Sequence, residues 1–327
     1  MKPVVVVGTG IVGASIAHHL TRTGVPVTVV GRDGGATASS FGWIGGGDRG
    51  HWPGGAADLS GLVVDDWRRL EQEVPGLGLR RTGSLRWPVT DDTGTDLVDS
   101  NTIAHLEPAL RAVPDRASHD PRDAGVDAPR AARTLLLAAR DAGAHVYYGT
   151  TVTHIHTDGV STSAGLLPAS TVVLAAGAGT AALTRHLTDP ARIADTSSAL
   201  LIRVRAETGL VRGIIATPQL EVREVRDREL LITAPLGDTW TWTDLRTAAR
   251  HARHELATTF GDGRRMLRGW RVGTRPMPAR GPLIGRLTPH VYAAVMHSGV
   301  CLAPSVGRLA AAEITSGTAA PELSGCR

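Results

Sequence analysis

The stretch Val4-Val5-Val6-Val7-Gly8-Thr9-Gly10-Ile11-Val12-Gly13 decides the fold class of this chain. Its four valines form an apolar, β-branched run, which is typical of a strand buried on both faces. The glycines follow that strand at once, and residues 14–22 then carry apolar side chains at helical spacing before Gly24 ends the helix. A second valine-rich strand over residues 27–30 completes a β-α-β unit.

The glycines Gly8, Gly10 and Gly13 have the spacing GxGxxG in the place where dinucleotide-binding proteins carry it. Gly8 allows a tight turn, Gly10 lets a pyrophosphate approach the backbone, and Gly13 lets helix and strand pack closely. The phosphates would lie at the helix N-terminus, where free N–H groups favour negative charge. The alternative is a tight turn with no ligand, but the two flanking elements favour a dinucleotide site.

Gly31 stands where an acidic residue is expected to hold the adenosine ribose, about twenty positions after the glycines. Two interpretations follow from Gly31-Arg32-Asp33. Either Arg32 accepts the 2′-phosphate of NADP, or the site binds FAD with Asp33, Arg32 or backbone groups in place of the usual carboxylate.

The composition is that of a folded protein of 327 residues, 42% of them hydrophobic and 20% charged. The 35 basic and 31 acidic residues give a net charge of +4, and the arginines are scattered along the chain, so we expect no nucleic-acid partner. The apolar runs are much shorter than the roughly 20 residues of a membrane span, so we expect no membrane partner. Two cysteines and no signal-peptide pattern at the N-terminus predict a cytoplasmic protein.

Lys2 is the only lysine in the sequence. Arginine forms no Schiff base and is not a tunable ammonium. A pyridoxal lysine, a P-loop lysine and a lysine base are therefore excluded unless Lys2 itself serves.

Four stretches, in this order along the chain, resemble the FAD-dependent oxidoreductases of the D-amino-acid oxidase family, which includes glycine oxidase and sarcosine oxidase. Residues 34–47, GGATASSFGWIGGG, resemble the family's small-residue stretch over the FAD pyrophosphate. Residues 166–179, LLPASTVVLAAGAG, resemble its strand that ends close to the cofactor. Residues 273–285, GTRPMPARGPLIG, resemble its GxRPxxxxxxPxIG segment. Residues 296–317, MHSGVCLAPSVGRLAAAEITSG, resemble the segment whose glycine turn and following helix meet the flavin and the pyrophosphate.

The resemblance implies that the cofactor is FAD. It is implied to be noncovalent, because the segment around Val272 lacks the cysteine that binds flavin in the sarcosine-oxidase branch. The residues implied to contact FAD are Gly8, Gly10, Ile11, Val12, Gly13, Arg32, Thr37, Ser39, Ser40, Gly42, Trp43, Val152, Ala176, Gly177, Gly299, Val300 and Cys301.

The expected fold is α/β: a Rossmann-like FAD-binding domain of the glutathione-reductase type, interleaved with a smaller, mainly antiparallel α+β substrate domain. Residues 1–79, 125–194 and 271–327 are assigned to the first domain, and 80–124 and 195–270 to the second. In the first we expect a helix opening at Asp127-Ala128-Pro129, strands near 145–148, 152–156 and 171–176, and a C-terminal helix near Pro304–Ile314.

In the substrate domain, the alternation of apolar residues predicts further strands and one helix. The expected strands cover residues 80–89, 200–205, 210–215, 221–225 and 230–233, and the expected helix covers residues 244–259.

Arg275 is the first candidate for catalysis, because it matches the family position whose guanidinium binds the substrate carboxylate. His51 and His297 are expected near the flavin, where histidine could tune the protonation of an amine. A structural salt bridge for Arg275 and structural roles for both histidines are the alternatives. Trp43, Trp240 and Trp242 are candidate aromatic walls or core residues.

No metal site is expected. His154 and His156 share a strand face but lack a third ligand nearby, and His251, His254 and Glu255 do not match the HExxH zinc pattern.

The implied function is FAD-dependent oxidation of the C–N bond of a small amino acid or secondary amine to an imine, which water then hydrolyses. Dioxygen or another oxidant would accept the electrons. The sarcosine-oxidase branch uses a lysine near the flavin for oxygen, and none is available here, which gives weight to another acceptor. The glycine oxidase and D-amino-acid oxidase types manage without this lysine, so oxygen stays open. The alternatives are an NADP-dependent reductase, suggested by Arg32, and a degenerate flavoprotein without amine oxidase activity. The sequence leaves the oligomeric state open.

Overall fold

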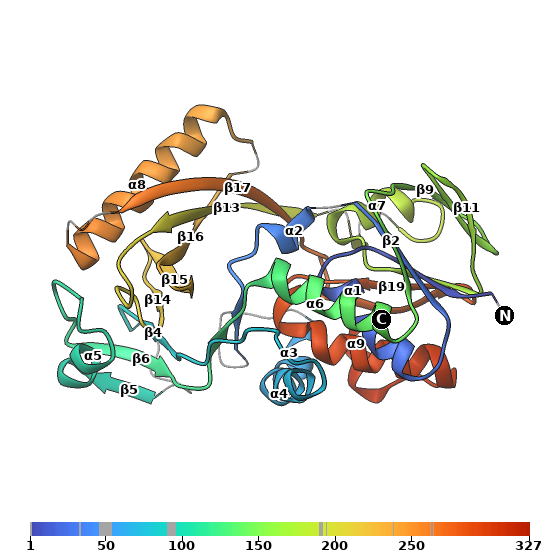
Figure 1. Ribbon diagram of the computed structural model, residues 1–327, viewed down its shortest axis with the longest axis horizontal. Helices are drawn as coiled ribbons and strands as arrows, with labels where there is room; N and C mark the ends of the chain where they lie inside the picture. The colour runs from blue at the N-terminus through green and yellow to red at the C-terminus, as the bar shows by residue number, and fades with distance from the viewer. Residues whose placement is uncertain are drawn as a thin grey trace.

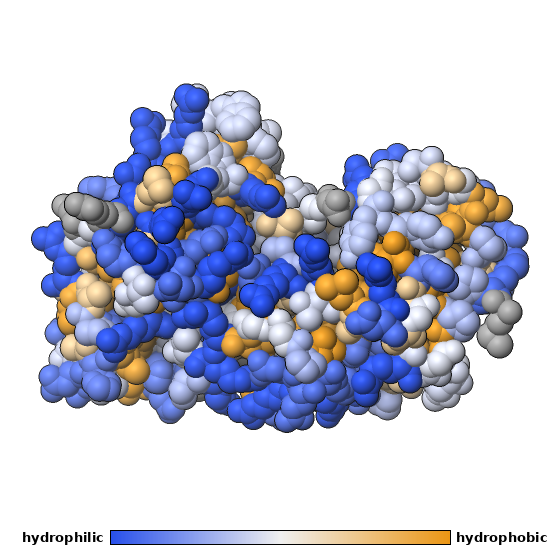
Figure 2. Space-filling model, in the orientation of Figure 1, coloured by the Kyte–Doolittle hydropathy of each residue, from blue (hydrophilic) through white to orange (hydrophobic). Residues whose placement is uncertain are grey.

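The computed structural model describes residues 2–32, 34–45, 54–89, 96–189, 192–193, 195–237, 239–261, 263 and 265–327. Two sheets, each with its own helices, build two domains that lie side by side (Figure 1). They form two lobes with a notch between them along one edge, and hydrophobic residues are scattered among hydrophilic ones on the face that Figure 2 shows. No helix within the described residues is long and apolar enough to span a membrane.

The first sheet has six strands in the order β18-β19-β12-β1-β2-β8. All neighbours in it are parallel except β18 and β19. The valines of β1 are almost completely buried, as expected for a central strand with layers on both faces. The strands are β1 (Val4–Val7), β2 (Val27–Gly31), β8 (His145–Tyr148), β12 (Thr171–Leu174), β18 (Leu283–Thr288) and β19 (Val291–Val295).

Helices cover one face of this sheet, and a small antiparallel sheet covers the other (Figure 1). A Cβ on Gly307 would lie 2.1 Å from Ser15 Oγ, so helices α1 and α9 cross in close contact. The helices are α1 (Ile11–Arg22), α4 (Val63–Glu73), α6 (Ala128–Asp141) and α9 (Gly299–Ser316). The small sheet contains β9 (Val152–Ile155), β10 (Gly159–Thr162) and β11 (Gly165–Pro168).

The second sheet has eight strands in the order β17-β13-β16-β15-β14-β4-β6-β5, and only the β14–β4 pair is parallel. It curls around one end of the molecule, with helix α8 (Trp242–Phe260) packed on its outer face (Figure 1). The strands are β4 (Ser84–Arg86), β5 (Asp96–Asp99), β6 (Arg116–Asp120), β13 (Thr196–Arg205), β14 (Ile214–Ala216), β15 (Glu221–Arg226), β16 (Glu229–Pro235) and β17 (Met266–Pro276).

Short elements connect the two domains or flank them. They are α2 (Gly35–Ala38), β3 (Trp43–Ile44), α3 (Ala56–Ser60), α5 (Ser100–Leu106), β7 (Ala124–Gly125), η1 (Gly177–Gly179), α7 (Thr180–Leu183) and η3 (Pro321–Cys326).

The expected fold class is confirmed, with a parallel Rossmann-like sheet and a largely antiparallel second sheet. Every strand of the six-stranded sheet falls within the ranges assigned to the cofactor domain, while β17 crosses the assigned boundary at residue 271. The exact boundaries stay a prediction.

Three element predictions were clearly wrong in extent, and the strands β5, β6 and β17 of the second sheet were not expected at all. The C-terminal helix begins at Gly299 and not near Pro304, because buried apolar side chains on both sides of Pro304 pack the helix into the core. The strand expected over 80–89 is reduced to β4, with Arg80 forming a single bridge to Gly125. The strand expected over 210–215 is reduced to β14. Both strands extend only over the residues that pair with a neighbouring strand.

Candidate active site

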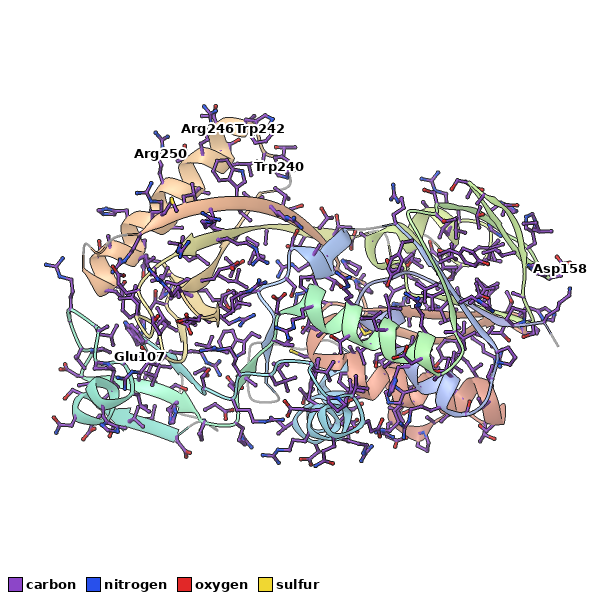
Figure 3. All side chains as sticks on the ribbon, viewed as in Figure 1. Glu107, Asp158, Trp240, Trp242, Arg246 and Arg250 are labelled. Carbon is purple, nitrogen blue, oxygen red and sulfur yellow. The ribbon has the colours of Figure 1, made fainter. Side chains whose placement is uncertain are left out.

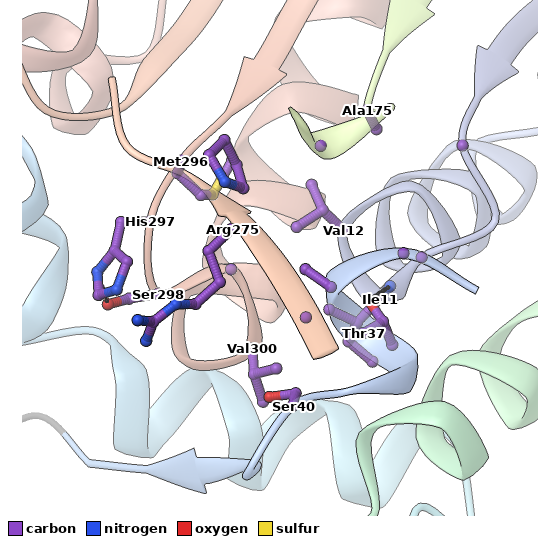
Figure 4. Close-up of a pocket in the computed structure, with 18 of the residues that line it drawn as sticks. Ile11, Val12, Thr37, Ser40, Ala175, Arg275, Met296, His297, Ser298 and Val300 are labelled. Atoms are coloured by element: carbon purple, nitrogen blue, oxygen red, sulfur yellow. Dashed lines mark hydrogen bonds between the residues drawn. The ribbon is translucent and has the colours of Figure 1, made fainter. Parts of the chain in front are cut away.

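A cavity of about 910 Å³ lies between the two sheets. Much of its wall comes from five separated segments, namely the Gly8–Val12 turn, the residues around α2, the η1 turn, the end of β17, and the start of α9. Figure 4 shows how these segments converge, with Arg275 reaching from β17 toward the start of α9. Such a cavity suits an extended ligand that reaches from one domain to the other.

The glycine turn leaves no room for side chains. A Cβ on Gly8 would lie 2.2 Å from Ala175 O, and a Cβ on Gly13 would lie 2.1 Å from Gly8 O. Gly8, Gly10, Ile11 and Val12 line the cavity, while Gly13 lies beneath it at the helix–strand contact. The first turn of α1 therefore presents bare backbone to the cavity, which suits a pyrophosphate.

Thr9 occupies the space beside Gly31. A Cβ on Gly31 would lie 2.9 Å from the Thr9 backbone nitrogen and 3.1 Å from its methyl carbon. The Thr9 hydroxyl donates a hydrogen bond to Arg32 O at 3.0 Å, and the exposed Arg32 lines the same end of the cavity. Asp33, the other substitute considered for the missing acid, lies outside the described residues.

Helix α2 and the segment after it form one long side of the cavity. Thr37 Oγ1 accepts a hydrogen bond from Ile11 N at 3.1 Å, which joins this segment to the glycine turn. Ser39 Oγ donates to Val272 O at 3.2 Å, which joins it to β17. Ser40, Gly42 and Trp43, which are among the residues predicted to contact the cofactor, also line the cavity.

The remaining predicted cofactor residues lie on the opposite wall and at the start of α9. Val152, Ala176 and Gly177 line the opposite wall. Gly299, Val300 and Cys301 line the cavity at the start of α9, after Ser298 in the left-handed conformation with φ of 58°. The positive end of the α9 dipole therefore borders the cavity.

Arg275 and His297 lie together at the domain boundary (Figure 4). Arg275 Nη2 donates to Ser197 Oγ at 3.1 Å, and no acceptor among the described residues lies within hydrogen-bonding distance of its buried Nε. Burial lowers the pKa of His297, and the charge of Arg275 lowers it further. His297 Nδ1 lies 2.9 Å from Ser298 Oγ. Histidine 297 is therefore neutral near pH 7, beside a guanidinium that faces the cavity.

The second sheet contributes a wall that the sequence did not reveal. Arg86, Glu221 and Thr233 line it together with the small residues Ala199 and Ala216. A period-two pattern could have indicated Glu221 and Thr233, because Val222 and Ile232 face the opposite side in the core with α8. Arg86 lies on a strand of three residues, which is too short to show a pattern.

Trp240 and Trp242 are not aromatic walls of the cavity. They lie at the outer end of α8, where 41% and 71% of their surfaces are exposed (Figure 3). Trp43 does line the cavity, and its indole Nε1 donates to Asp123 Oδ2 at 3.0 Å. His51 lies outside the described residues.

Within the described residues, no group of three histidine, cysteine or acidic side chains could hold a metal ion. His186 does join His154 and His156, with its ring stacked on His154 at 5.1 Å between centroids. Parallel rings do not direct their nitrogens at one point. On α8, His251 lies 3.6 Å from Glu255 at the exposed surface.

Known proteins resemble this chain in sequence and in fold. Residues 3–313 match a family model described as DAO, FAD dependent oxidoreductase. No curated protein matched the chain.

Similar solved structures share the fold over nearly their whole length. They include glycine oxidase from Bacillus cereus ATCC 14579, with 21% identity, a TM-score of 0.84, and coverage of 99% of this chain and 98% of that one. L-Proline dehydrogenase from P. horikoshii has 21% identity, a TM-score of 0.82, and coverage of 98% and 96%. Iminodiacetate oxidase from Chelativorans sp. BNC1 has 20% identity, a TM-score of 0.82, and coverage of 98% and 97%.

Proposed function

The chain belongs to the DAO family of FAD-dependent oxidoreductases, as its four ordered motifs predicted, and on this premise we propose that it oxidises the C–N bond of a small amino acid or secondary amine. The names of the similar structures, which are amine-oxidising enzymes, support this class of reaction. The observation that carries the proposal is the position of the Arg275 guanidinium, which faces the cavity beside the start of α9.

The residues of the cavity fit FAD. The bare backbone at Gly8 and Gly10 would hold the pyrophosphate, and Thr37 and Ser40 would lie along the cofactor. The N-terminus of α9 would stabilise negative charge on the reduced flavin ring. Binding would be noncovalent, because Val272 stands where a covalent cysteine would be expected and the Cys301 thiol donates to Trp43 O at 3.0 Å.

Bound FAD supplies a hydride acceptor at flavin N5. Arg275 would bind the substrate carboxylate and so fix the carbon next to nitrogen against the flavin. Neutral His297, its pKa lowered by burial and by Arg275, can take up the proton that the substrate nitrogen gives up. Loss of a hydride from carbon and a proton from nitrogen leaves the imine, which water hydrolyses to a carbonyl compound and an amine or ammonia.

Dioxygen or another oxidant would take the electrons from the flavin. Lys2, the only lysine, lies 3.6 Å from Asp158 at the exposed edge of the molecule. No lysine can therefore assist a reaction with oxygen, which favours another acceptor.

Arg275→Ala and Arg275→Lys test the proposed role of the guanidinium. Loss of a charge-assisted bidentate contact, at about 1.5–3 kcal/mol per hydrogen bond, predicts a decrease of roughly 100-fold or more in kcat/KM for amino acids. Lysine, a point charge, should restore only part of it.

Arg271→Ala is the matched control, because Arg271 lies on the same strand but outside the cavity lining. The readout is anaerobic reduction of the bound flavin by glycine, sarcosine, proline and D-alanine. Equal rates in Arg275→Ala and the control would contradict the proposed role.

A further inference from the structure

Within the described residues, the end of the cavity beside Gly31 has no acidic side chain to bind a ribose. Such a residue normally stands at the end of the second strand, where its carboxylate accepts a hydrogen bond from the ribose 2′-hydroxyl. Arg32 lines this end, but a guanidinium has N–H donors and no acceptor. Among the described residues that line the cavity, the only carboxylate is that of Glu221, on β15 of the second sheet. A different acceptor is therefore needed at the end of β2.

Thr9 lies where that acceptor is needed. It follows the end of β1, the strand next to β2, and both Thr9 and Gly31 line the cavity. Thr9 Oγ1 lies 3.2 Å from the position that a Cβ on Gly31 would take. The oxygens of an acidic side chain lie about 2.4 Å from its Cβ in aspartate and up to about 3.7 Å in glutamate. The Thr9 hydroxyl is therefore within the range of distances from residue 31 that a carboxylate oxygen would have.

The proton of the Thr9 hydroxyl is already used inside the protein. Thr9 Oγ1 donates it to Arg32 O at 3.0 Å, in an exposed hydrogen bond. A threonine hydroxyl has one proton and two lone pairs that can accept. While the bond to Arg32 holds, the oxygen can only accept from a ligand. It therefore has the acceptor chemistry of an ionised carboxylate without the negative charge.

The absence of a side chain at Gly31 makes this arrangement possible. A Cβ there would lie 2.9 Å from the Thr9 backbone nitrogen and 3.1 Å from the Thr9 methyl carbon. Both distances are too short for ordinary packing, so the Thr9 side chain and an acidic residue at position 31 cannot both fit unless the turn shifts. The missing acid and the threonine hydroxyl are thus two parts of one arrangement.

We propose that the Thr9 hydroxyl accepts a hydrogen bond from the 2′-hydroxyl of the FAD adenosine and so takes the place of the acidic residue. This inference rests on the proposed binding of FAD in the cavity and does not depend on the reaction. The bond joins two neutral groups, and such bonds are about half as strong as those to a carboxylate. The ribose hydroxyl therefore contributes a modest, measurable share of the affinity for FAD.

Paired titrations of the flavin-free chain test this. Flavin fluorescence would measure the dissociation constants of FAD and of an FAD analogue that contains 2′-deoxyadenosine. We expect the wild-type chain to bind FAD about 5-fold more tightly than the analogue, which is the effect of one neutral hydrogen bond. The ratio of the two constants is the readout, because a general disturbance of the site changes both constants together. Equal constants for the two flavins in the wild type would overturn the inference.

Variants at residue 9 assign the contact. Thr9→Val keeps the shape of the side chain and removes its hydroxyl, so the preference for FAD over the analogue should disappear, and Thr9→Ser should restore it. Thr153→Val is the matched control and should keep the wild-type preference. Thr153 Oγ1 also donates to a backbone carbonyl, Ser161 O at 3.3 Å, but Thr153 does not line the cavity. A preference that persists in Thr9→Val, or that disappears only in Asp33→Asn, would overturn the inference.

Reduction of bound FAD by small amines is measured separately on the same wild-type preparation. Reduction by an amine without any preference for FAD over the analogue overturns the role of Thr9 and leaves amine oxidation standing. The preference without reduction by any amine supports the role of Thr9 and contradicts the proposed reaction.

Discussion

Thr9 fills the space next to Gly31, at the end of the cavity where we propose that the adenosine binds. Glutamate or aspartate at residue 31 would be the usual way to bind a ribose, but its Cβ would lie 2.9 Å from the Thr9 backbone nitrogen. The glycine turn would have to move to accept it. The chain therefore has no space for the ribose carboxylate that its β-α-β unit would otherwise carry.

Gly31→Glu is expected to weaken FAD binding by about 10-fold or more, because overpacking at this point costs roughly 1–3 kcal/mol and displaces the turn. Thr9→Gly added to it should recover part of the loss by removing the contacts with the threonine side chain. Fluorescence titration with FAD measures both. Tighter FAD binding by Gly31→Glu alone would show that the missing acid, and not the space, limits affinity.

Cavity residues that belong to one local sequence motif could be predicted from the sequence. Cavity residues that come together only through strand pairing could not. Gly8, Gly10 and Arg275 belong to short patterns whose spacing is visible in the chain, and the structure brings them to one cavity. Arg86 and Glu221 are 135 residues apart and meet only through the pairing of β14 with both β4 and β15. No local pattern encodes such a pairing.

Among the helices, α1 carries a titratable pair in its buried half. Burial, together with the neighbouring His19 and Arg22, lowers the pKa of His18 to about 4, against the opposing effect of Glu73. Burial also lowers the pKa of His19. In the unfolded chain a histidine has a pKa of about 6.5, so between pH 6.5 and 4 the unfolded chain binds more protons than the folded one.

The free energy of unfolding should therefore fall as the pH decreases from 6.5 to 4, with His18 contributing on the order of 3 kcal/mol at most. His18→Leu should make this dependence shallower, because leucine removes the titrating group from the core. Urea unfolding at a series of pH values measures it. His145→Leu, at an exposed position, is the control, and identical slopes for wild type and His18→Leu would contradict the account.

At the scale of the whole molecule, Arg223 on β15 joins the two domains. Its Nε donates to Phe41 O at 2.7 Å and its Nη2 to Val126 O at 2.7 Å, both on segments of the cofactor domain. Gly42 and Gly125 make room for it, since a Cβ on either would lie within 2.8 Å of its guanidinium nitrogens. Burial lowers the pKa of Arg223 to about 9.

Arg223→Met should lower the free energy of unfolding by about 3 kcal/mol or more, because two buried carbonyls lose charge-assisted partners. FAD affinity should fall with it, since Phe41 and Gly42 line the cavity. Arg116→Met, at an exposed position of β6, is the control, with an expected loss below about 1 kcal/mol. Equal losses in urea unfolding would contradict a joining role for Arg223.

The two domains differ in how much of their structure could be predicted from the sequence. The cofactor domain contains the local unit β1-α1-β2, whose strands pair in parallel directly after one helix, although its other parallel pairs, such as β1 with β12, join distant segments. The substrate sheet pairs β17 with β13 and β14 with β4, which are far apart in the chain. Alternation indicated β13, β15 and β16, but it did not indicate β5, β6 and β17, the strand order or the lining residues.

The central claim is that this chain binds FAD and uses it to oxidise amines. An absorption spectrum of the purified protein, repeated after incubation with FAD and then after anaerobic addition of glycine, sarcosine, proline and D-alanine, tests it most directly. The account predicts flavin bands that bleach with at least one amine and return when an electron acceptor is added. Protein that holds no flavin after reconstitution, or a bound flavin that no amine bleaches, would contradict it.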